Sequence, residues 1–108
     1  MTFAREFPDF PATDFPALPP TFSDSSWRND VCPSLTSEVL KMQIFVDFAD
    51  RARREFPEGG RYTVNVIKDE DFTLETVLDT DDWNEVLALV ARHMNDGLLI
   101  ALANGGTR

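Results

Sequence analysis

The chain has 108 residues, of which 43% are hydrophobic and 27% are charged, and its formal net charge is −9. This length and composition predict one globular domain with a single core and exclude a fully disordered chain. The excess of acids excludes nucleic-acid binding through the overall field of the protein, because phosphate groups are neutralised by Lys and Arg.

The sequence gives no sign of a membrane segment. No apolar run reaches the roughly 20 residues that a membrane helix needs, and MTFAREFPDF lacks a basic region followed by an apolar core. The single cysteine, Cys32, cannot form an internal disulfide, which agrees with a reducing compartment. We therefore expect a cytoplasmic protein that makes no membrane contact.

Residues 1–21 form a segment rich in Pro and Phe, which we call the arm. Five of the seven prolines lie in its first 20 residues, and PDFPA is followed at once by TDFPA. This proline density favours extended, polyproline-like structure and leaves no room for a helix or a central strand. The arm either packs Phe7, Phe10 and Phe15 on its own domain or docks on another protein.

Residues 22–103 are expected to form one domain, with a tail at 104–108. The segment TFSDSSWRNDVCPS is rich in turn-forming residues and predicts an irregular loop pinned by Trp27. DRARREFPEGG predicts a helical turn and a Gly-Gly break between two strands. Alternation of apolar and polar residues predicts three antiparallel strands, over 40–48, 61–68 and 72–79.

A single helix is predicted after the third strand. Thr80 or Asp81 can cap it, Asp82 and Glu85 have the capping-box spacing, and Gly97 is expected to end it. Its apolar residues at helical spacing are Trp83, Val86, Leu87, Val90 and Met94. The apolar run LLIALA then predicts a further strand, parallel to the third because the helix crosses over.

These elements predict an α+β fold. We expect a three- to four-stranded, mainly antiparallel sheet with one helix packed on a face, preceded by the arm. The predicted core consists of Leu40, Met42, Ile44, Val46, Trp83, Val86, Leu87, Val90 and Ile100.

The most unusual segment is DEDFTLETVLDTDDWNE, residues 69–85, which has eight carboxylates and no Lys or Arg. The other 11 of the chain's 19 acids are nearly matched by its 10 Lys and Arg. Alternation predicts Glu75 and Asp79 on one strand face, about 13 Å apart at about 3.3 Å per residue. The segment is either a solvated face of turn and helix-start acids or a surface for a basic partner.

A metal site is a third interpretation of the same segment. Asp79, Asp81, Asp82 and Glu85 offer the oxygen ligands that Ca²⁺ and Mg²⁺ take. The spacing differs from that of an EF-hand loop, because Trp83 stands where a ligand is needed.

Catalysis has little support in the sequence. Cys32 and His93 are the only thiol and imidazole. Cys32 precedes Pro33 in a predicted loop and His93 lies near the end of the predicted helix, so neither shows the setting of an activated group. A Gly-rich phosphate loop, a serine elbow and a zinc-ligand cluster are missing as well. We expect no cofactor, no metal site and no enzymatic activity.

The segments FSDSSWRNDVCPS, FVDFADRARREFPE and DTDDWNEVL together resemble a group of short hypothetical proteins of bacterial phages and mobile elements, over about residues 22–90. The resemblance implies a context and no chemistry. In that context, small acidic proteins are often inhibitors of host defence, including anti-CRISPR proteins that occupy surfaces meant for nucleic acid.

We therefore expect a small acidic protein-interaction module, an anti-CRISPR-like inhibitor that blocks a basic, nucleic-acid-binding surface of a host protein such as a nucleoprotein defence complex. Its anchor would be Phe10 and Phe15 or an exposed edge strand. The predicted partner-binding residues are Asp69, Glu70, Asp71, Glu75, Asp79, Asp81, Asp82 and Glu85. The alternatives are an immunity-type protein that neutralises a basic toxin, and a divalent-metal-binding domain or minor enzyme. The sequence indicates neither the target nor the oligomeric state.

Overall fold

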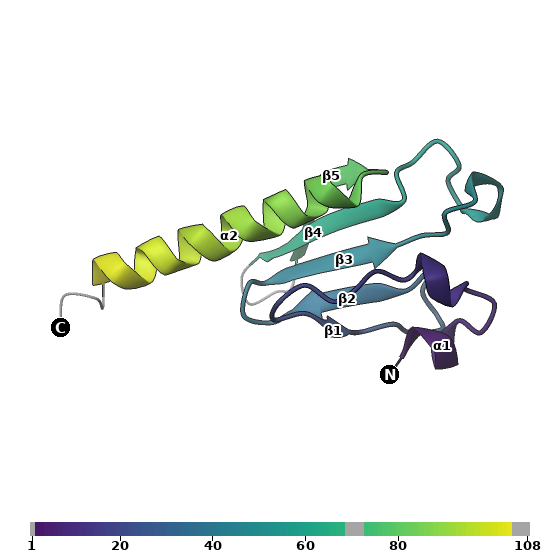
Figure 1. The fold of residues 1–108 in the computed structure, drawn as a ribbon, viewed down its shortest axis with the longest axis horizontal. Helices are drawn as coiled ribbons and strands as arrows, with labels where there is room; N and C mark the ends of the chain where they lie inside the picture. Colours follow the sequence, from purple (N-terminus) through teal and green to yellow (C-terminus); the bar gives the residue numbers. More distant parts are fainter. Residues whose placement is uncertain (1, 69–72, 105–108) are drawn as a thin grey trace.

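Five antiparallel strands form one sheet in the order β1-β2-β3-β4-β5, and a long helix follows the last strand (Figure 1). In this computed structural model, the described residues are 2–68 and 73–104, with side chains described for 2–68 and 74–96. The strands are β1 (Ser23–Asp24), β2 (Ser34–Ser37), β3 (Met42–Val46), β4 (Tyr62–Lys68) and β5 (Thr73–Thr80). The helices are α1 (Phe3–Glu6) and α2 (Trp83–Asn104), and the 3₁₀ turns are η1 (Ala12–Asp14) and η2 (Arg51–Arg53). The predicted α+β class is confirmed.

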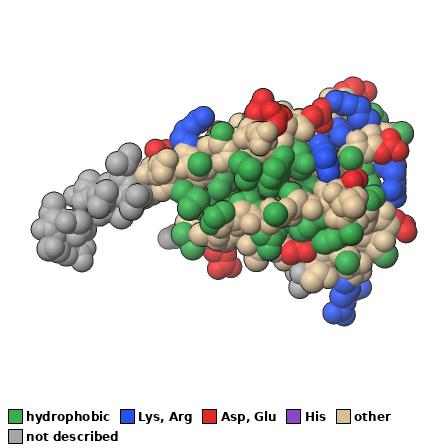
Figure 2. All heavy atoms as spheres, viewed as in Figure 1, with side chains coloured by type: hydrophobic (Ala, Val, Ile, Leu, Met, Phe, Trp, Pro, Cys, Tyr) green, Lys and Arg blue, Asp and Glu red, His purple; other side chains and the backbone are tan. Residues whose placement is uncertain are grey.

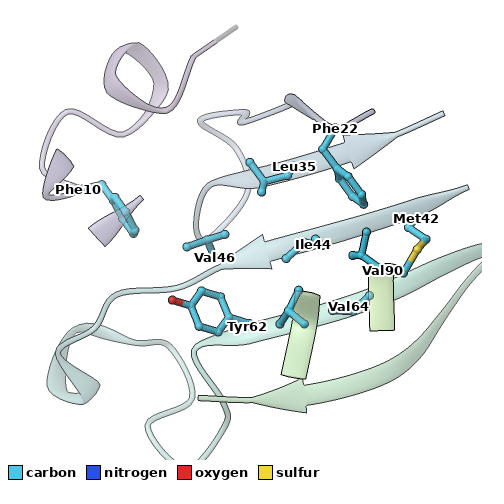
Figure 3. Packing of buried hydrophobic residues seen from close by; sticks show 10 residues of the cluster. Phe10, Phe22, Leu35, Met42, Ile44, Val46, Tyr62, Val64 and Val90 are labelled. Atoms are coloured by element: carbon cyan, nitrogen blue, oxygen red, sulfur yellow. The ribbon is translucent and has the colours of Figure 1, made fainter. Parts of the chain in front are cut away.

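One face of the sheet, here called the inner face, carries the core (Figure 3). Leu35, Ile44, Val64 and Leu78 are successive cross-strand partners on β2 to β5. The first three have no exposed surface. A slip of one residue would turn these side chains to the opposite face, so their burial keeps the strands in register.

Helix α2 covers the inner face over β4 and β5. Val86 and Val90, four residues apart, are buried in the core, and the Trp83 ring lies 5.0 Å from the ring of Tyr62. In Figure 1 the helix starts near the end of β5 and projects past the sheet. Within the described part of the chain, no helix is long and apolar enough to cross a bilayer.

The arm covers the rest of the inner face. Phe10 is only 4% exposed and belongs to the core cluster, while Phe3, Phe7 and Phe15 pack against that cluster. The ring of Phe10 lies 4.9 Å from that of Phe48, and the rings of Phe3 and Phe15 are stacked. The first interpretation of the arm is confirmed, and the expectation that Phe10 and Phe15 anchor a partner is wrong because both pack within the chain.

The strand predicted at LLIALA is wrong, because α2 continues through it to Asn104. A short apolar run has no periodicity that separates a buried strand from a helix. Gly97 does not end the helix, since a single interior Gly costs only about 1 kcal/mol relative to Ala.

The sheet has five strands, rather than three or four, because β1 and β2 lie in and after the segment predicted as an irregular loop. Both strands are short and rich in hydroxyl groups, and the Oγ of Ser25 bonds the hydroxyl groups of Ser34 at 2.9 Å and Thr36 at 2.7 Å. Trp27 does not pin this loop, because it is 48% exposed. The arm also has a turn of helix, α1, which fits only because it ends before Pro8.

The predicted core is confirmed at most positions, with exceptions on α2. Leu87 is 39% exposed, and Leu89 packs against the core instead. Leu89 lies three residues from the buried Val86 on the same helix face, whereas Leu87 is turned about 100° away. Leu40 packs against the core only partly buried, and the side chain of Ile100 lies outside the described residues.

Candidate protein-binding surface at the β5 edge

The predicted partner-binding residues lie on β5 and at the start of α2. Asp69, Glu70 and Asp71 fall outside the described residues. The remaining five are exposed: Glu75, Asp79, Asp81, Asp82 and Glu85. The structure brings them to the β5 edge of the sheet but gives most of them contacts within the chain.

A β-bulge interrupts β5 at Val77. Val64 pairs with Leu78, whereas the next residue of β4, Asn65, pairs with Thr76. Val77 is therefore an extra residue in β5, and the side-chain alternation shifts by one position there.

The bulge puts Glu75 and Asp79 on opposite faces of the sheet. Glu75 lies opposite Val66, on the inner face, and Asp79 lies opposite Thr63, on the other face, here called the outer face. The prediction that both project from one strand face is wrong, because it assumed an unbroken two-residue repeat. Glu75 also forms an ion pair with Lys68, so its charge is matched within the chain.

Asp81 is held by three arginines from the segment between β3 and β4. Its Oδ1 accepts the backbone N–H of Arg61 at 2.9 Å and the guanidinium of Arg54 at 3.1 Å, and its Oδ2 pairs with Arg51. The Arg61 N–H, followed by the guanidinium groups of Arg54 and Arg51, holds the pKa of Asp81 below its ordinary value of 3.8. Asp81 therefore stabilises the fold through these contacts within the chain.

Arg54 organises the loop that leads into β4. Its side chain is 3% exposed and donates to the carbonyl groups of Phe48 at 2.6 Å, Ala49 at 3.2 Å and Gly59 at 3.1 Å, besides Asp81. A buried guanidinium needs such a set of acceptors, because an unpaired buried charge is costly. The basic cluster in RARREFPEGGR is visible in the sequence, but its pairing with a distant acid is not.

Asp79 contacts the same loop through Gly60. Its Oδ1 accepts the Gly60 N–H at 2.6 Å. A Cβ on Gly60 would lie 2.5 Å from the backbone N of Thr80 and 2.8 Å from its carbonyl C, so only glycine fits against β5 at this point. The described residues provide no cation that pairs with Asp79.

Asp82 is the N-cap of α2. The sequence had offered Thr80 or Asp81 as the cap, and the spacing of a capping box at Asp82 and Glu85. The Oδ1 of Asp82 accepts the Asn84 N–H at 2.9 Å, and its own N–H donates to Thr80 Oγ1 at 3.0 Å. Glu85 lies in the first turn of the helix, where negative charge is favourable.

Three exposed carboxylates thus have no cationic partner among the described residues: Asp79, Asp82 and Glu85. We call this set the acidic junction, because it surrounds the connection between β5 and α2. Figure 2 shows acidic side chains next to basic ones at this end of the molecule. Cations of the chain therefore pair with two of the five carboxylates in residues 73–85, and the other three form the acidic junction.

The acidic junction adjoins the β5 edge of the sheet, where no further strand pairs among the residues that the structure describes. β5 is the last strand in the sheet order and has eight residues, whereas β1 at the other edge has two. A groove of about 290 Å³ lies between β5 and α2, and it is lined by Val77, Leu78, Glu85, Ala88, Leu89 and Arg92. Edge strands can accept a strand from another protein, and charges or bulges restrict which strand is accepted.

A second hollow, here called the outer pocket, lies on the outer face. Its volume is about 320 Å³. Aromatic rings, carboxylates and the Gly-Gly break line it, including Cys32, Phe45, Asp47, Phe56, Thr63 and Asp79.

The thiol in this pocket is a poor nucleophile. Burial, and then the negative charges of Asp47, Asp30 and Glu55, raise the pKa of Cys32 to about 12. His93 belongs to α2, which packs on the inner face, so the sheet separates it from Cys32. The structure does not bring the candidate catalytic pair together.

The candidate metal ligands are not gathered either. Within the ranges described, no group of three or more His, Cys, Asp or Glu side chains is arranged to hold a metal ion. Of the four candidate ligands, Asp81 binds guanidinium groups, and Asp79 and Asp82 each turn an oxygen to a backbone N–H.

Comparison with known proteins finds no relative: no family model, no curated protein and no solved structure matches the chain. Geometry and charge are therefore the grounds for a functional assignment.

Proposed function

We propose that the chain is a small acidic protein-interaction module that binds a basic surface of another protein at the acidic junction and the adjoining edge of β5. The observation that supports this proposal is the set of three exposed carboxylates that the chain's own arginines leave unmatched. They lie next to an edge strand and a groove, where a partner segment can make contact over a continuous area.

The charge of this edge selects the partner. Two copies of the chain would bring like charges together along β5, which disfavours self-pairing. A basic segment is attracted instead, and long-range attraction of this kind mainly raises the association rate.

The partner that fits best is a protein surface that otherwise holds nucleic acid, because such surfaces present Lys and Arg to phosphate groups. The chain would place its carboxylates against those side chains and act as a competitive inhibitor. The resemblance to phage proteins favours a host nucleoprotein defence complex as the partner.

The test uses two variants with equal changes in net charge. The first neutralises the acidic junction with amides of nearly the same shape: Asp79→Asn, Asp82→Asn and Glu85→Gln. Asn caps a helix as well as Asp does, so α2 keeps its N-cap. The control neutralises three exposed acids elsewhere on the surface: Asp9→Asn, Glu38→Gln and Asp96→Asn.

Each variant is immobilised and used to capture the partner from an extract of the native host over a range of salt concentrations. We expect the junction variant to lose affinity by about tenfold or more at low salt and to show a weaker salt dependence, and the control variant to behave as wild type. Equal capture by both variants, with equal salt dependence, would refute the proposal.

A second measurement tests the inhibitory role. Oligonucleotide that is bound by the purified partner should displace the chain, and the chain should displace the oligonucleotide. A ternary complex of partner, chain and oligonucleotide would contradict competition.

A further inference from the structure

We propose that the outer pocket is a binding site for one basic side chain, a lysine or an arginine, presented by the protein that the acidic junction attracts. This inference rests on the proposed function and names the group that anchors the partner. A surface ion pair alone contributes little affinity, so a tight complex needs such an anchor.

The pocket is built on a cross-strand row of the outer face. Phe45, Thr63 and Asp79 are successive partners on β3, β4 and β5, so their side chains lie side by side. Asp47 follows Phe45 by two residues and lines the same pocket. Phe56 comes from the loop before β4 and is 68% exposed.

These side chains match a cation on a long apolar stem. The aliphatic part of Lys or Arg can lie along Phe45, and aromatic faces attract the charged end. Asp79 and Asp47 each use Oδ1 for a backbone N–H, from Gly60 at 2.6 Å and from Phe48 at 2.8 Å. The second oxygen of each carboxylate makes no hydrogen bond within the described residues and can accept one from the cation.

The local field favours a positive charge. Burial is the largest cause of the raised pKa of Cys32, and the charges of Asp47, Asp30 and Glu55 raise it further, so the charges that act on this thiol are negative. Burial raises the pKa of Asp47 even though the Phe48 N–H and the charge of Arg54 lower it, so a further cation would replace part of the solvation that this carboxylate has lost.

Arg61 lines the pocket as well, but its charge is directed elsewhere. Its Nη2 donates to the carbonyl oxygen of Asp14 at 2.6 Å, and its guanidinium lies 5.1 Å from the centre of the Tyr62 ring. Tyr62 belongs to the inner-face core, so the guanidinium of Arg61 does not occupy the cation position.

The pocket suits a side chain of a protein better than a free cation. Phe56 and Val31, which is 58% exposed, both line it. A docked protein surface would cover these apolar groups, whereas a small free cation would leave them in water.

The first experiment is an NMR titration of the full chain with Nα-acetyl-lysine methylamide and Nα-acetyl-arginine methylamide. Nα-acetyl-norleucine methylamide serves as the uncharged control of similar shape. The charged compounds should shift the amide signals of Gly60, Thr63 and Asp79, and the neutral one should not. Equal shifts from all three compounds, or shifts outside the pocket only, would overturn the inference.

Two variants then test the pocket walls, with matched controls away from it. Phe56→Ala and Asp47→Asn should each weaken binding of the charged amides, by between about twofold and thirtyfold for the aromatic contact. Val39→Ala, at a residue that is 77% exposed, and Asp96→Asn should leave binding unchanged.

The same variants separate this inference from the proposed function. Phe56→Ala should also weaken capture of the partner while the salt dependence stays as in wild type. Capture that depends on the acidic junction but not on Phe56 would overturn the pocket and keep the proposed function. Binding of the charged amides together with capture that does not depend on the acidic junction would overturn the proposed function instead. Charged amides that bind but do not compete with the captured partner would identify a free cation as the ligand and overturn the protein anchor.

Discussion

Phenylalanine side chains differ in exposure between the two faces of the sheet. On the inner face, Phe10 is 4% exposed and lies beside the rings of Phe3 and Phe48, while on the outer side Phe56 is 68% exposed. Figure 3 shows how closely the inner side chains gather. The chain itself buries the apolar side chains of the inner face, whereas the outer face has exposed apolar side chains that another molecule can cover.

The forces also differ. The inner face is stabilised by apolar burial, which depends little on pH. The loop that builds the outer pocket is held by Arg54, Asp79 and Asp81 through hydrogen bonds and charge, with Gly60 packed against β5. The effects of substitutions on the free energy of unfolding should therefore differ between the two sides, both in magnitude and in pH dependence.

The largest contrast is expected between two phenylalanines. Phe10→Ala should lower the free energy of unfolding by about 3–5 kcal/mol, because it leaves a cavity in the core. Phe56→Ala should change it by less than about 0.5 kcal/mol, because its ring is mostly in water. Urea unfolding followed by circular dichroism gives both values. A loss in Phe10→Ala as small as that in Phe56→Ala would show that the arm is not part of the core.

The next contrast is between two arginines that share Asp81. Arg54→Lys should cost about 2–3 kcal/mol of stability, because an ammonium cannot reach all the carbonyl groups that the guanidinium bonds. Arg51→Lys should cost less than about 0.5 kcal/mol, since its ion pair is exposed. The comparison uses thermal unfolding at one pH. A larger loss at Arg51 would mean that the exposed pair, and not the buried guanidinium, holds the loop.

Adjacent glycines provide a smaller contrast. A Cβ on Gly60 would meet the backbone of Thr80 at 2.5 Å, whereas on Gly59 the nearest atom is the Phe56 carbonyl oxygen at 3.3 Å. Gly60→Ala should cost about 1–3 kcal/mol and Gly59→Ala less than about 1 kcal/mol. Denaturant midpoints measure both, and a tolerated Gly60→Ala would refute the close approach of the loop to β5.

The smallest expected effect is a pH dependence at Asp81. The folded-state pKa of Asp81 is lowered, so its charge stabilises the fold above the ordinary value of 3.8, and this contribution is lost as the pH falls through the lowered pKa. Wild type should therefore lose more stability than Asp81→Asn between about pH 6 and about pH 3. Asp47→Asn should act in the opposite sense, because burial raises the pKa of Asp47. Parallel pH curves for wild type and Asp81→Asn would show that the arginine contacts do not matter for stability.

Alternation in the sequence was sufficient for the central strands. β3 and β4 each have one face in the core, so every second residue had to be apolar, and Met42, Ile44 and Val64 were identifiable as buried from the sequence. In β5, alternation predicted the wrong face for one of the two acids Glu75 and Asp79, because the strand contains one extra residue. The sequence contains no local sign of the bulge at Val77, because the bulge is defined by pairing with β4.

The candidate site shows the same division. The acidity of residues 69–85 is evident from composition, but which acids remain unmatched depends on Arg51 and Arg54, which lie 30 and 27 residues from Asp81. No pattern in the sequence predicted the outer pocket either, because the residues that line it come from separate segments, among them Cys32, Phe45, Phe56 and Asp79.

The sequence by itself determined the α+β class, the positions of β3, β4 and β5, and the start of α2, because each depends on a repeat or a cap among neighbouring residues. Only the tertiary structure decided that LLIALA continues α2, that the arm packs its phenylalanines on the core, and that the acidic junction is reduced to Asp79, Asp82 and Glu85. The physical reason is that burial and ion pairing are contacts between segments far apart in the chain, and local patterns carry no information about which segments meet.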